Sequence, residues 1–241
     1  MKNLAFTLRP VAAGILLLTS GISMASIVSL NGTDVIFTYD DTLTGLFGTP
    51  TVSGNILFFT PTSFQAISTN GVGTVVTNSN MNILVTPNEG FNMSFVNLQE
   101  RGDYSLKGAG STVDVGGQLR AFDVGNPFTV QDAAFINTTL PTTTNDNRFH
   151  DWTATASLDL SSAAWQNANS INITIENVLE ATTTSNPSKA FIDKKFSGVQ
   201  ISIDGIAPPQ AVPVPAAMWL FGSGLLGLVG VSRRRVTSIV A

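Results

Sequence analysis

Several side chains that could do chemistry lie close together in DNRFHDW, residues 146–152. The segment contains the only histidine of the chain, His150, beside Arg148, Phe149 and Trp152. Aromatic rings can stack on the apolar face of a sugar, and polar groups can bond its hydroxyls. One interpretation is therefore a glycan contact made by Arg148, Phe149, His150 and Trp152. The interpretation we favour places Phe149 and Trp152 in a core at the edge of a loop, with the polar residues solvated.

The sequence offers little support for catalysis. A single histidine excludes a two-histidine metal centre, and the absence of cysteine excludes thiolate metal sites, disulfides and a cysteine nucleophile. No G-x-S-x-G segment is present, so a serine-hydrolase elbow is not indicated. The 16 acidic residues include no pair that the sequence distinguishes as a glycosidase pair. We therefore expect no catalytic residues and no enzymatic activity.

A cofactor is likewise not expected. Asp40-Asp41 and Asn145-Asp146-Asn147 offer oxygen ligands that suit Ca²⁺, but neither fits an EF-hand loop, and turn capping explains both. The segment Gly222–Gly227 matches G-x-G-x-x-G without a preceding strand or a following acid, so it is not a dinucleotide fingerprint. We expect no metal and no cofactor, with Ca²⁺ as the one ion to consider.

The charges are divided unevenly along the chain. Residues 26–207 hold all 16 acidic residues and 7 basic ones, a formal charge of −9, and the other five basic residues lie near the two ends. An acidic middle with scattered basic residues offers no footprint for a phosphate backbone. Nucleic acid is therefore not an expected partner.

The first 25 residues are typical of a secretory signal peptide. Two basic residues precede an apolar stretch, residues 10–22, and the small residues Ser23 and Ala25 suit signal peptidase. We expect cleavage between Ala25 and Ser26. The alternative is an uncleaved anchor, but the apolar stretch is shorter than the ~20 residues of a spanning helix.

The last part of the chain is an apolar run followed by arginines. Residues 216–231 carry no charge, and at about 1.5 Å per helical residue they reach only ~24 Å of a ~30 Å hydrocarbon core. The basic cluster Arg233, Arg234 and Arg235 follows, which the positive-inside rule places in the cytoplasm. We expect a short membrane helix that serves as a temporary anchor, with residues 236–241 as a cytoplasmic tail.

This tail resembles the PEP-CTERM sorting signal of Gram-negative bacteria. Val212, Pro213, Val214 and Pro215, the run AAMWLFGSGLLGLVG and the arginines follow the order of that signal over residues 212–235. The sequence departs from the motif at Val214, where the motif has glutamate. The resemblance implies processing by exosortase, passage through the inner membrane and release to the cell surface or extracellular matrix of a bacterium that makes exopolysaccharide. An ordinary membrane anchor is the alternative.

Between the two ends, apolar residues recur with a period of two, which is typical of strands with one buried face. The residues expected to face a core are Val35, Phe37 and Tyr39; Met81, Ile83 and Val85; Phe91, Met93 and Phe95; Ala154, Ala156, Leu158 and Leu160; Ile171, Ile173 and Ile175; and Val199, Ile201 and Ile203. No amphipathic helix of ten residues is apparent. The Thr-rich stretches 137–147 and 181–187 are expected to be loops, and 208–211 a linker.

Together these patterns predict an all-β domain over residues 26–207, an antiparallel β-sandwich that is jelly-roll-like, with a single closed sheet as the alternative. The leading functional hypothesis is a non-enzymatic surface or matrix protein associated with exopolysaccharide or biofilm. A carbohydrate-binding module is the second hypothesis, and a polysaccharide-modifying enzyme is the third.

Overall fold

A computed structural model describes residues 26–140 and 144–205. The predicted signal peptide, linker and sorting tail lie outside these residues. Within them the only helical segments are three short 3₁₀ turns, η1 (Asp41–Leu43), η2 (Gly45–Phe47) and η3 (Trp165–Asn167). No helix in this part of the chain is long and apolar enough to cross a membrane. The described chain is all-β, as the sequence predicts.

The strands form two antiparallel sheets, A and B. Sheet A has the order β1-β2-β6-β12-β8-β9, with β1 (Ile27–Asn31), β2 (Val35–Asp40), β6 (Gly73–Pro87), β12 (Ile171–Thr183), β8 (Ser111–Asp123) and β9 (Gln131–Phe135). Sheet B has the order β10-β11-β7-β13-β4-β3, with β10 (Asn137–Thr138), β11 (His150–Asp159), β7 (Phe91–Lys107), β13 (Lys189–Gly205), β4 (Ile56–Phe59) and β3 (Thr51–Ser53). A further strand, β5 (Gln65–Thr69), also pairs with β13.

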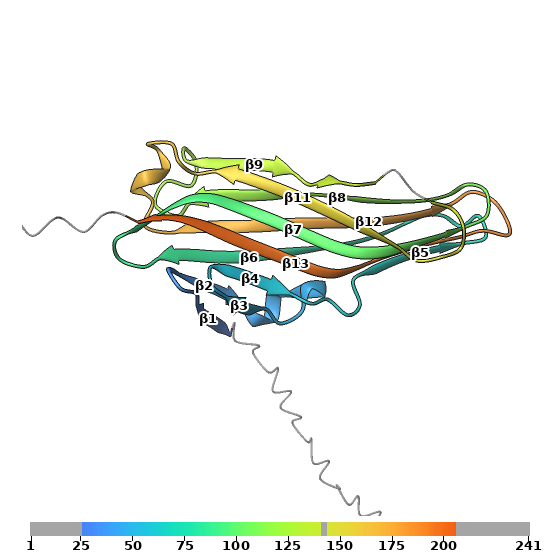
Figure 1. Cartoon of the computed structure of the whole chain (residues 1–241), viewed down its shortest axis with the longest axis horizontal. Coiled ribbons are helices and arrows are strands. Elements are labelled where there is room, and N and C mark those ends of the chain that lie inside the picture. The colour runs from blue at the N-terminus through green and yellow to red at the C-terminus, as the bar shows by residue number, and fades with distance from the viewer. Residues whose placement is uncertain (1–25, 141–143, 206–241) are drawn as a thin grey trace, which may run out of the picture.

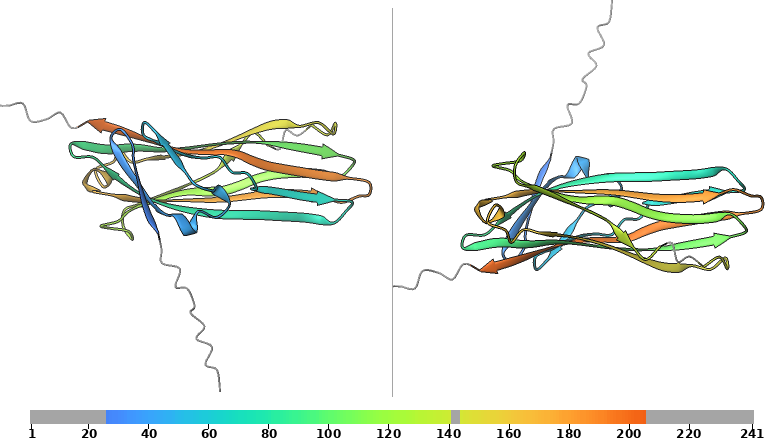
Figure 2. Two further views of the ribbon diagram at one scale, coloured as in Figure 1. Left: turned by 90° about the horizontal axis from the view of Figure 1, so that it is seen from below. Right: turned by 90° about the horizontal axis from the view of Figure 1, so that it is seen from above.

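The long strands give the domain an elongated shape (Figure 1). β7 and β13 each have 17 residues, and β6 has 15. The chain changes sheet between β6 and β7, between β7 and β8, and between β12 and β13. Figure 2 shows the long strands as two layers. Consecutive long strands therefore lie mostly in opposite layers, and side chains far apart in sequence meet between them.

The two sheets share one hydrophobic core, to which both contribute the inward residues of their alternating strands. Most of the predicted core faces are confirmed: Val35, Phe37, Met81, Ile83, Ala154, Leu158, Ile171, Ile173, Val199 and Ile201 are buried. An apolar side chain buried in such a core stabilises the fold by about 1.5–3 kcal/mol. Packing between the sheets thus fixes which face of each strand is inside.

Three predictions about the strands are wrong. The stretch 137–147 is not wholly a loop, because β10 (Asn137–Thr138) pairs with β11. Phe95 does not share the core face with Met93, because the pairing of β7 with β13 shifts register there and the alternation changes phase; Phe95 is 39% exposed while Val96 is buried. The stretch 181–187 is not wholly a loop, since β12 continues through Thr183, with Ala181 and Thr183 buried. Threonine suits a strand as well as a loop, and pairing with β6 and β8 decides between them.

Candidate functional site

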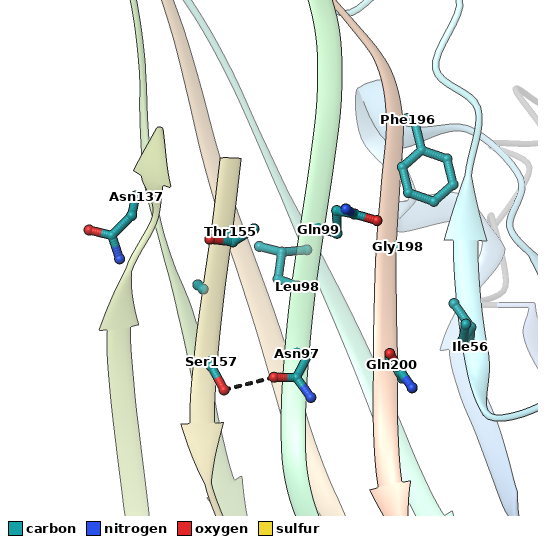
Figure 3. A pocket seen from close by; sticks show the side chains of 11 residues that line it. Ile56, Asn97, Leu98, Gln99, Asn137, Thr155, Ser157, Phe196, Gly198 and Gln200 are labelled. Atoms are coloured by element: carbon teal, nitrogen blue, oxygen red, sulfur yellow. Dashed lines mark hydrogen bonds between the residues drawn. The ribbon is translucent and has the colours of Figure 1, made fainter. Parts of the chain in front are cut away.

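The outer face of sheet B carries a shallow depression of about 520 Å³ (Figure 3). It lies over β11, β7 and β13, three strands that pair side by side. Its lining side chains are mostly uncharged and polar: Asn97, Gln99, Asn137, Thr155, Ser157 and Gln200, with Ile56 and Phe196 at one side. It is therefore a polar surface hollow built on regular strands.

Strand register arranges the polar side chains in two rows. Asn97 on β7 lies opposite Ser157 on β11 and Gln200 on β13. Ser157 Oγ donates to Asn97 Oδ1 over 2.8 Å, which leaves the amide nitrogen of Asn97 available to a ligand. Two residues further along β7, Gln99 lies opposite Thr155 and Gly198. The spacing is that of alternate residues of a strand, which all face the same side.

Gly198 and Phe196 shape one side of the hollow. A Cβ at position 198 would lie 2.8 Å from Cζ of Phe196, so glycine leaves the room that the phenyl ring uses. The ring of Phe196 stacks on Phe58, with centroids 6.3 Å apart, and Arg101 Cζ lies 4.6 Å from its centroid. Packing on both sides therefore holds Phe196 at the edge of the polar rows.

These groups suit a ligand rich in hydroxyls. Amide side chains offer both donors and acceptors, and an aromatic ring offers an apolar surface beside them. The residues that line the hollow carry no formal charge. The arrangement can thus hydrogen-bond a neutral sugar chain, and the nearby cation Arg101 is stacked on the ring of Phe196.

The segment 146–152 folds back on itself at the other candidate site. His150 Nε2 lies 2.8 Å from Asp146 Oδ1, and the rings of His150 and Tyr104 have centroids 5.5 Å apart. The hydrogen bond with His150, and next the backbone N–H of Arg148, lower the pKa of Asp146 below its usual value. Asp146 and His150 therefore hold each other rather than standing free for a ligand.

The four residues proposed for a glycan contact do not share one surface. Trp152 is only 1% exposed, and its Nε1 donates to the backbone O of Asp193 over 3.0 Å, so its ring belongs to the core and a stacking role is wrong. Phe149 is 68% exposed and packs its edge on Phe191, so its predicted burial is also wrong. Arg148 is exposed and His150 partly so. A glycan contact by Arg148, Phe149 and His150 stays a prediction.

The sequence interpretation missed the polar hollow. Asn97 and Gln99 occupy outward positions of an alternating run, which by itself indicates only a solvated face. Their rows become visible when β11 and β13 are set beside β7. The only sign of the hollow in the sequence was the presence of asparagine and glutamine at successive outward positions.

Two of the carboxylates considered for Ca²⁺, Asp40 and Asp146, have other partners in the structure. Asp40 caps η1 by accepting from the backbone N–H and the hydroxyl of Thr42 at 2.9 and 2.6 Å. Asp146 is engaged with His150, as described above. In residues 26–140 and 144–205 no three His, Asp or Glu side chains lie together as metal ligands would. The expectation of no metal and no cofactor stays a prediction.

The sorting residues Val212–Pro215 and Arg233–Arg235 lie outside the described residues, as does Ala25 of the predicted cleavage site, and Ser26 is the first residue described. Among solved structures, a chain of the infectious bursal disease virus Gt strain is similar with 12% identity and a TM-score of 0.22, over 83% of this chain and 60% of that chain. A likeness of this size supports no inference about this chain. A search of curated proteins found no match.

A family model for the PEP-CTERM protein-sorting motif matches residues 211–235. The match confirms the resemblance seen in the tail, including the segment around Val214. Such a motif indicates a protein that is anchored in the membrane during sorting, processed by exosortase and exported. The chain is therefore a protein that carries a PEP-CTERM sorting motif.

Proposed function

We propose that this protein is a non-enzymatic component of the cell surface or extracellular matrix, associated with exopolysaccharide or biofilm. The observation that carries the proposal is the sorting motif at residues 211–235. In this scheme signal peptidase cuts between Ala25 and Ser26, the apolar tail spans the inner membrane for a time, and exosortase removes it near Pro213–Pro215. The part of the chain that reaches the surface is then the domain of residues 26–207. We describe this domain as jelly-roll-like because its chain passes repeatedly from one sheet to the other.

Mass spectrometry of both chain ends tests the route, with protein taken from the membrane and extracellular fractions of the native host. We expect an extracellular chain that begins at Ser26 and ends near Pro213–Pro215. The variant Val214→Glu restores the glutamate of the motif and should increase the processed fraction. A chain that is found only in the inner membrane and retains Arg233–Arg235 would contradict the proposal and indicate a plain anchor.

A second candidate function, carbohydrate binding, is favoured by the polar hollow on sheet B. Asn97, Gln99 and Gln200 present uncharged hydrogen-bonding groups in register, beside the held ring of Phe196. The excess of acidic residues over residues 26–207 disfavours a polyanionic polymer. A neutral polysaccharide, rather than an acidic one, is the ligand class that fits.

A pull-down with the host's own exopolysaccharide tests this function. The double variant Asn97→Ala, Gln99→Ala should lower binding at least ten-fold, because a few polar groups fix the orientation of a ligand. The control is Asn78→Ala, an exposed asparagine on β6 of the other sheet, which should bind as the wild type does. Equal binding of the polysaccharide by both variants would exclude the hollow as its binding site. Turnover of the polymer in the same assay would instead support the third hypothesis, a polysaccharide-modifying enzyme.

A further inference from the structure

Between the sheets lies a buried group of polar side chains, which we name the polar centre: Glu100 on β7, Asn177 on β12, and Lys194 and Ser197 on β13. Glu100, Asn177 and Ser197 are 0% exposed and Lys194 is 1% exposed. Charged side chains are seldom buried so completely unless they are paired. The polar centre therefore needs a reason beyond packing.

The side chains of the polar centre contact one another directly. Lys194 Nζ lies 2.7 Å from Glu100 Oε2 and contacts Oδ1 of the Asn177 amide. Asn177 Nδ2 donates to the same Glu100 oxygen over 3.1 Å, and Ser197 Oγ donates to Oε1 over 3.1 Å. The amine, the amide and the carboxylate thus form a closed triangle, with the carboxylate touching both nitrogen atoms.

The fold holds this triangle in place from two sheets. Lys194 continues the inward positions of Ala190 and Ile192, and the register shift between Lys194 and Phe196 then changes the phase of β13. Glu100 lies opposite Ser197 across the β7–β13 pair. Asn177 comes from β12 in sheet A, at an inward position between Ile175 and Leu179. The Lys194–Asn177 contact therefore crosses from one sheet to the other.

Aromatic rings surround the amine and exclude water. Lys194 Nζ lies 5.2, 5.8 and 5.9 Å from the ring centroids of Phe64, Phe47 and Trp152. Burial lowers the pKa of Lys194, while the nearby Glu100 carboxylate opposes that shift. A lysine with a lowered pKa holds more of the neutral amine, which is the nucleophilic form.

We propose that Lys194 and Asn177 are joined by an intramolecular isopeptide bond, formed without any other protein and with Glu100 transferring the protons. In this reaction Glu100 takes a proton from the Lys194 ammonium, and the neutral Nζ attacks Cγ of Asn177. Glu100 then returns the proton to Nδ2 as the Cγ–Nδ2 bond breaks, and Nζ gives up a second proton to the departing nitrogen. The Nζ–Cγ amide forms, Asn177 Nδ2 leaves as ammonium, and Glu100 is again a carboxylate.

The geometry assigns each group its part in this step. Proximity and fixed orientation in a water-excluded site replace a bimolecular encounter. Glu100 touches both the attacking and the leaving nitrogen, as a proton shuttle must. Lys195, the next residue, pairs with Asp103 but its side chain is 55% exposed and has no amide partner in the structure described. Only the inward lysine therefore meets the requirements.

Such a bond would link the sheets covalently in a chain that has no cysteine for a disulfide. It would close a loop over the 17-residue separation between Asn177 and Lys194 and would tie β12 to β13. Cross-links act mainly by restricting the unfolded chain. An exported protein would gain this restriction without an oxidising partner.

Tryptic peptide mapping of the full chain from its host tests the bond. An amidated Lys194 resists trypsin, so we expect peptide 190–195 joined to peptide 149–189, with a total mass lower by one ammonia, about 17 Da. Fragmentation must place the branch at Lys194 and Asn177. The mass of the intact chain would not decide the question, because Asn31-Gly32 and Asn70-Gly71 can also lose ammonia as succinimides. Recovery of unbranched 149–189 and 190–194 from folded protein would overturn the proposal.

Two variants test the roles of the individual groups. Glu100→Gln keeps the shape of the side chain but cannot shuttle a proton, so its peptides should be unbranched and at full mass. Lys195→Arg keeps trypsin cleavage after position 195 and should retain the branch. A branched peptide in Glu100→Gln would overturn the role of Glu100. The wild-type map decides the existence of the bond by itself, even if a variant does not fold.

Discussion

Strand β7 presents two polar surfaces that differ in almost every respect. Its outward residues Asn97 and Gln99 line an open hollow, whereas Glu100, on the inward side, lies in the polar centre with Lys194. The covalent spacing is the same on both faces, and only the surroundings differ. On the outer face water competes for each hydrogen bond, while on the inner face an unpaired group would pay its full desolvation cost.

This difference teaches that position decides the role of a polar residue more than its type does. An outward amide costs little to keep and stays available to a ligand. A carboxylate at an inward position is tolerated only when other side chains pair with it. The paired side chains then either stabilise the fold or react with one another. In the part of the chain that the structure describes, no buried side-chain nitrogen or oxygen lacks a partner. The polar centre is therefore complete as built.

The largest expected effect follows from breaking the polar centre. Lys194→Ala removes the ion-pair partner of the buried Glu100 carboxylate or, in protein that has formed the isopeptide bond, removes the cross-link. In either state the free energy of unfolding should fall by about 3–5 kcal/mol. Urea unfolding measures the change, with Lys195→Ala as the control, which should stay within about 1 kcal/mol of the wild type. Similar losses in the two variants would show that the inner face is no more sensitive than the outer face.

The next effect concerns Gly102, an inward position of the same strand. A Cβ there would lie 1.9 Å from the backbone O of Asp193 and 2.8 Å from ring atoms of Trp152. Gly102→Ala should therefore lower the free energy of unfolding by about 1–3 kcal/mol. The matched control is Gly116→Ala on β8, where a Cβ meets nothing within 4 Å. Equal thermal stability of the two variants would contradict the close packing of Trp152 on β7.

A smaller effect is expected on the outer face. Asn97→Ala removes one hydrogen bond with Ser157 at a partly exposed position, and the free energy of unfolding should change by no more than about 0.5 kcal/mol. Chemical denaturation of the variant measures this change. A loss as large as that of Lys194→Ala would mean that the outer row supports the fold, and the contrast between the two faces would not hold.

The smallest effect is a pH dependence within the β7–β13 pair. Burial raises the pKa of Asp193, which lies opposite Asp103 and near Lys195. The folded state therefore binds the proton more tightly than the unfolded state, and the stability of the wild type declines as the pH rises from the unfolded pKa of about 4 through the raised folded pKa.

Asp193→Asn removes this titration while keeping an oxygen that can accept from the backbone N–H of Asp103. The stability of the variant relative to the wild type should therefore rise over that pH interval and be constant above it. Thermal unfolding from pH 3 to pH 8 measures the difference. A relative stability that falls with pH would show that the Asp193 carboxylate is stabilised by its neighbours rather than disfavoured by burial.

Much of the fold could be predicted because strand alternation is a local signal. The inward faces of β2, β11 and β12 follow directly from residues such as Val35, Ala154 and Ile171. The same rule already placed Asn177 in phase with Ile173 and Ile175, and Lys194 in phase with Ile192. Polar residues at inward positions were thus the signal in the sequence for the polar centre. This signal did not reveal the cluster, because the alternation of one strand says nothing about which residues of other strands it meets.

The errors come from the places where alternation changes. Phe95 faces outward because a register shift changes the phase of β7, and the sequence carries no local mark of that shift. Trp152 lies in the core as the favoured interpretation has it, whereas Phe149 does not, since β11 begins at His150 and only its pairing with β7 decides which ring is inside. Alternation therefore does not determine whether a side chain is buried or exposed at strand ends and register shifts.

The sequence by itself determined the class of fold and the sorting route, because both are written in contiguous residues: the period of two in the strands and the motif at residues 211–235. Only the tertiary structure decided which polar residues meet. Glu100, Asn177 and Lys194 lie on three strands of two sheets, and Asn97, Ser157 and Gln200 on three strands of one. Contacts between distant strands depend on register and on the packing of the sheets, which no local pattern specifies.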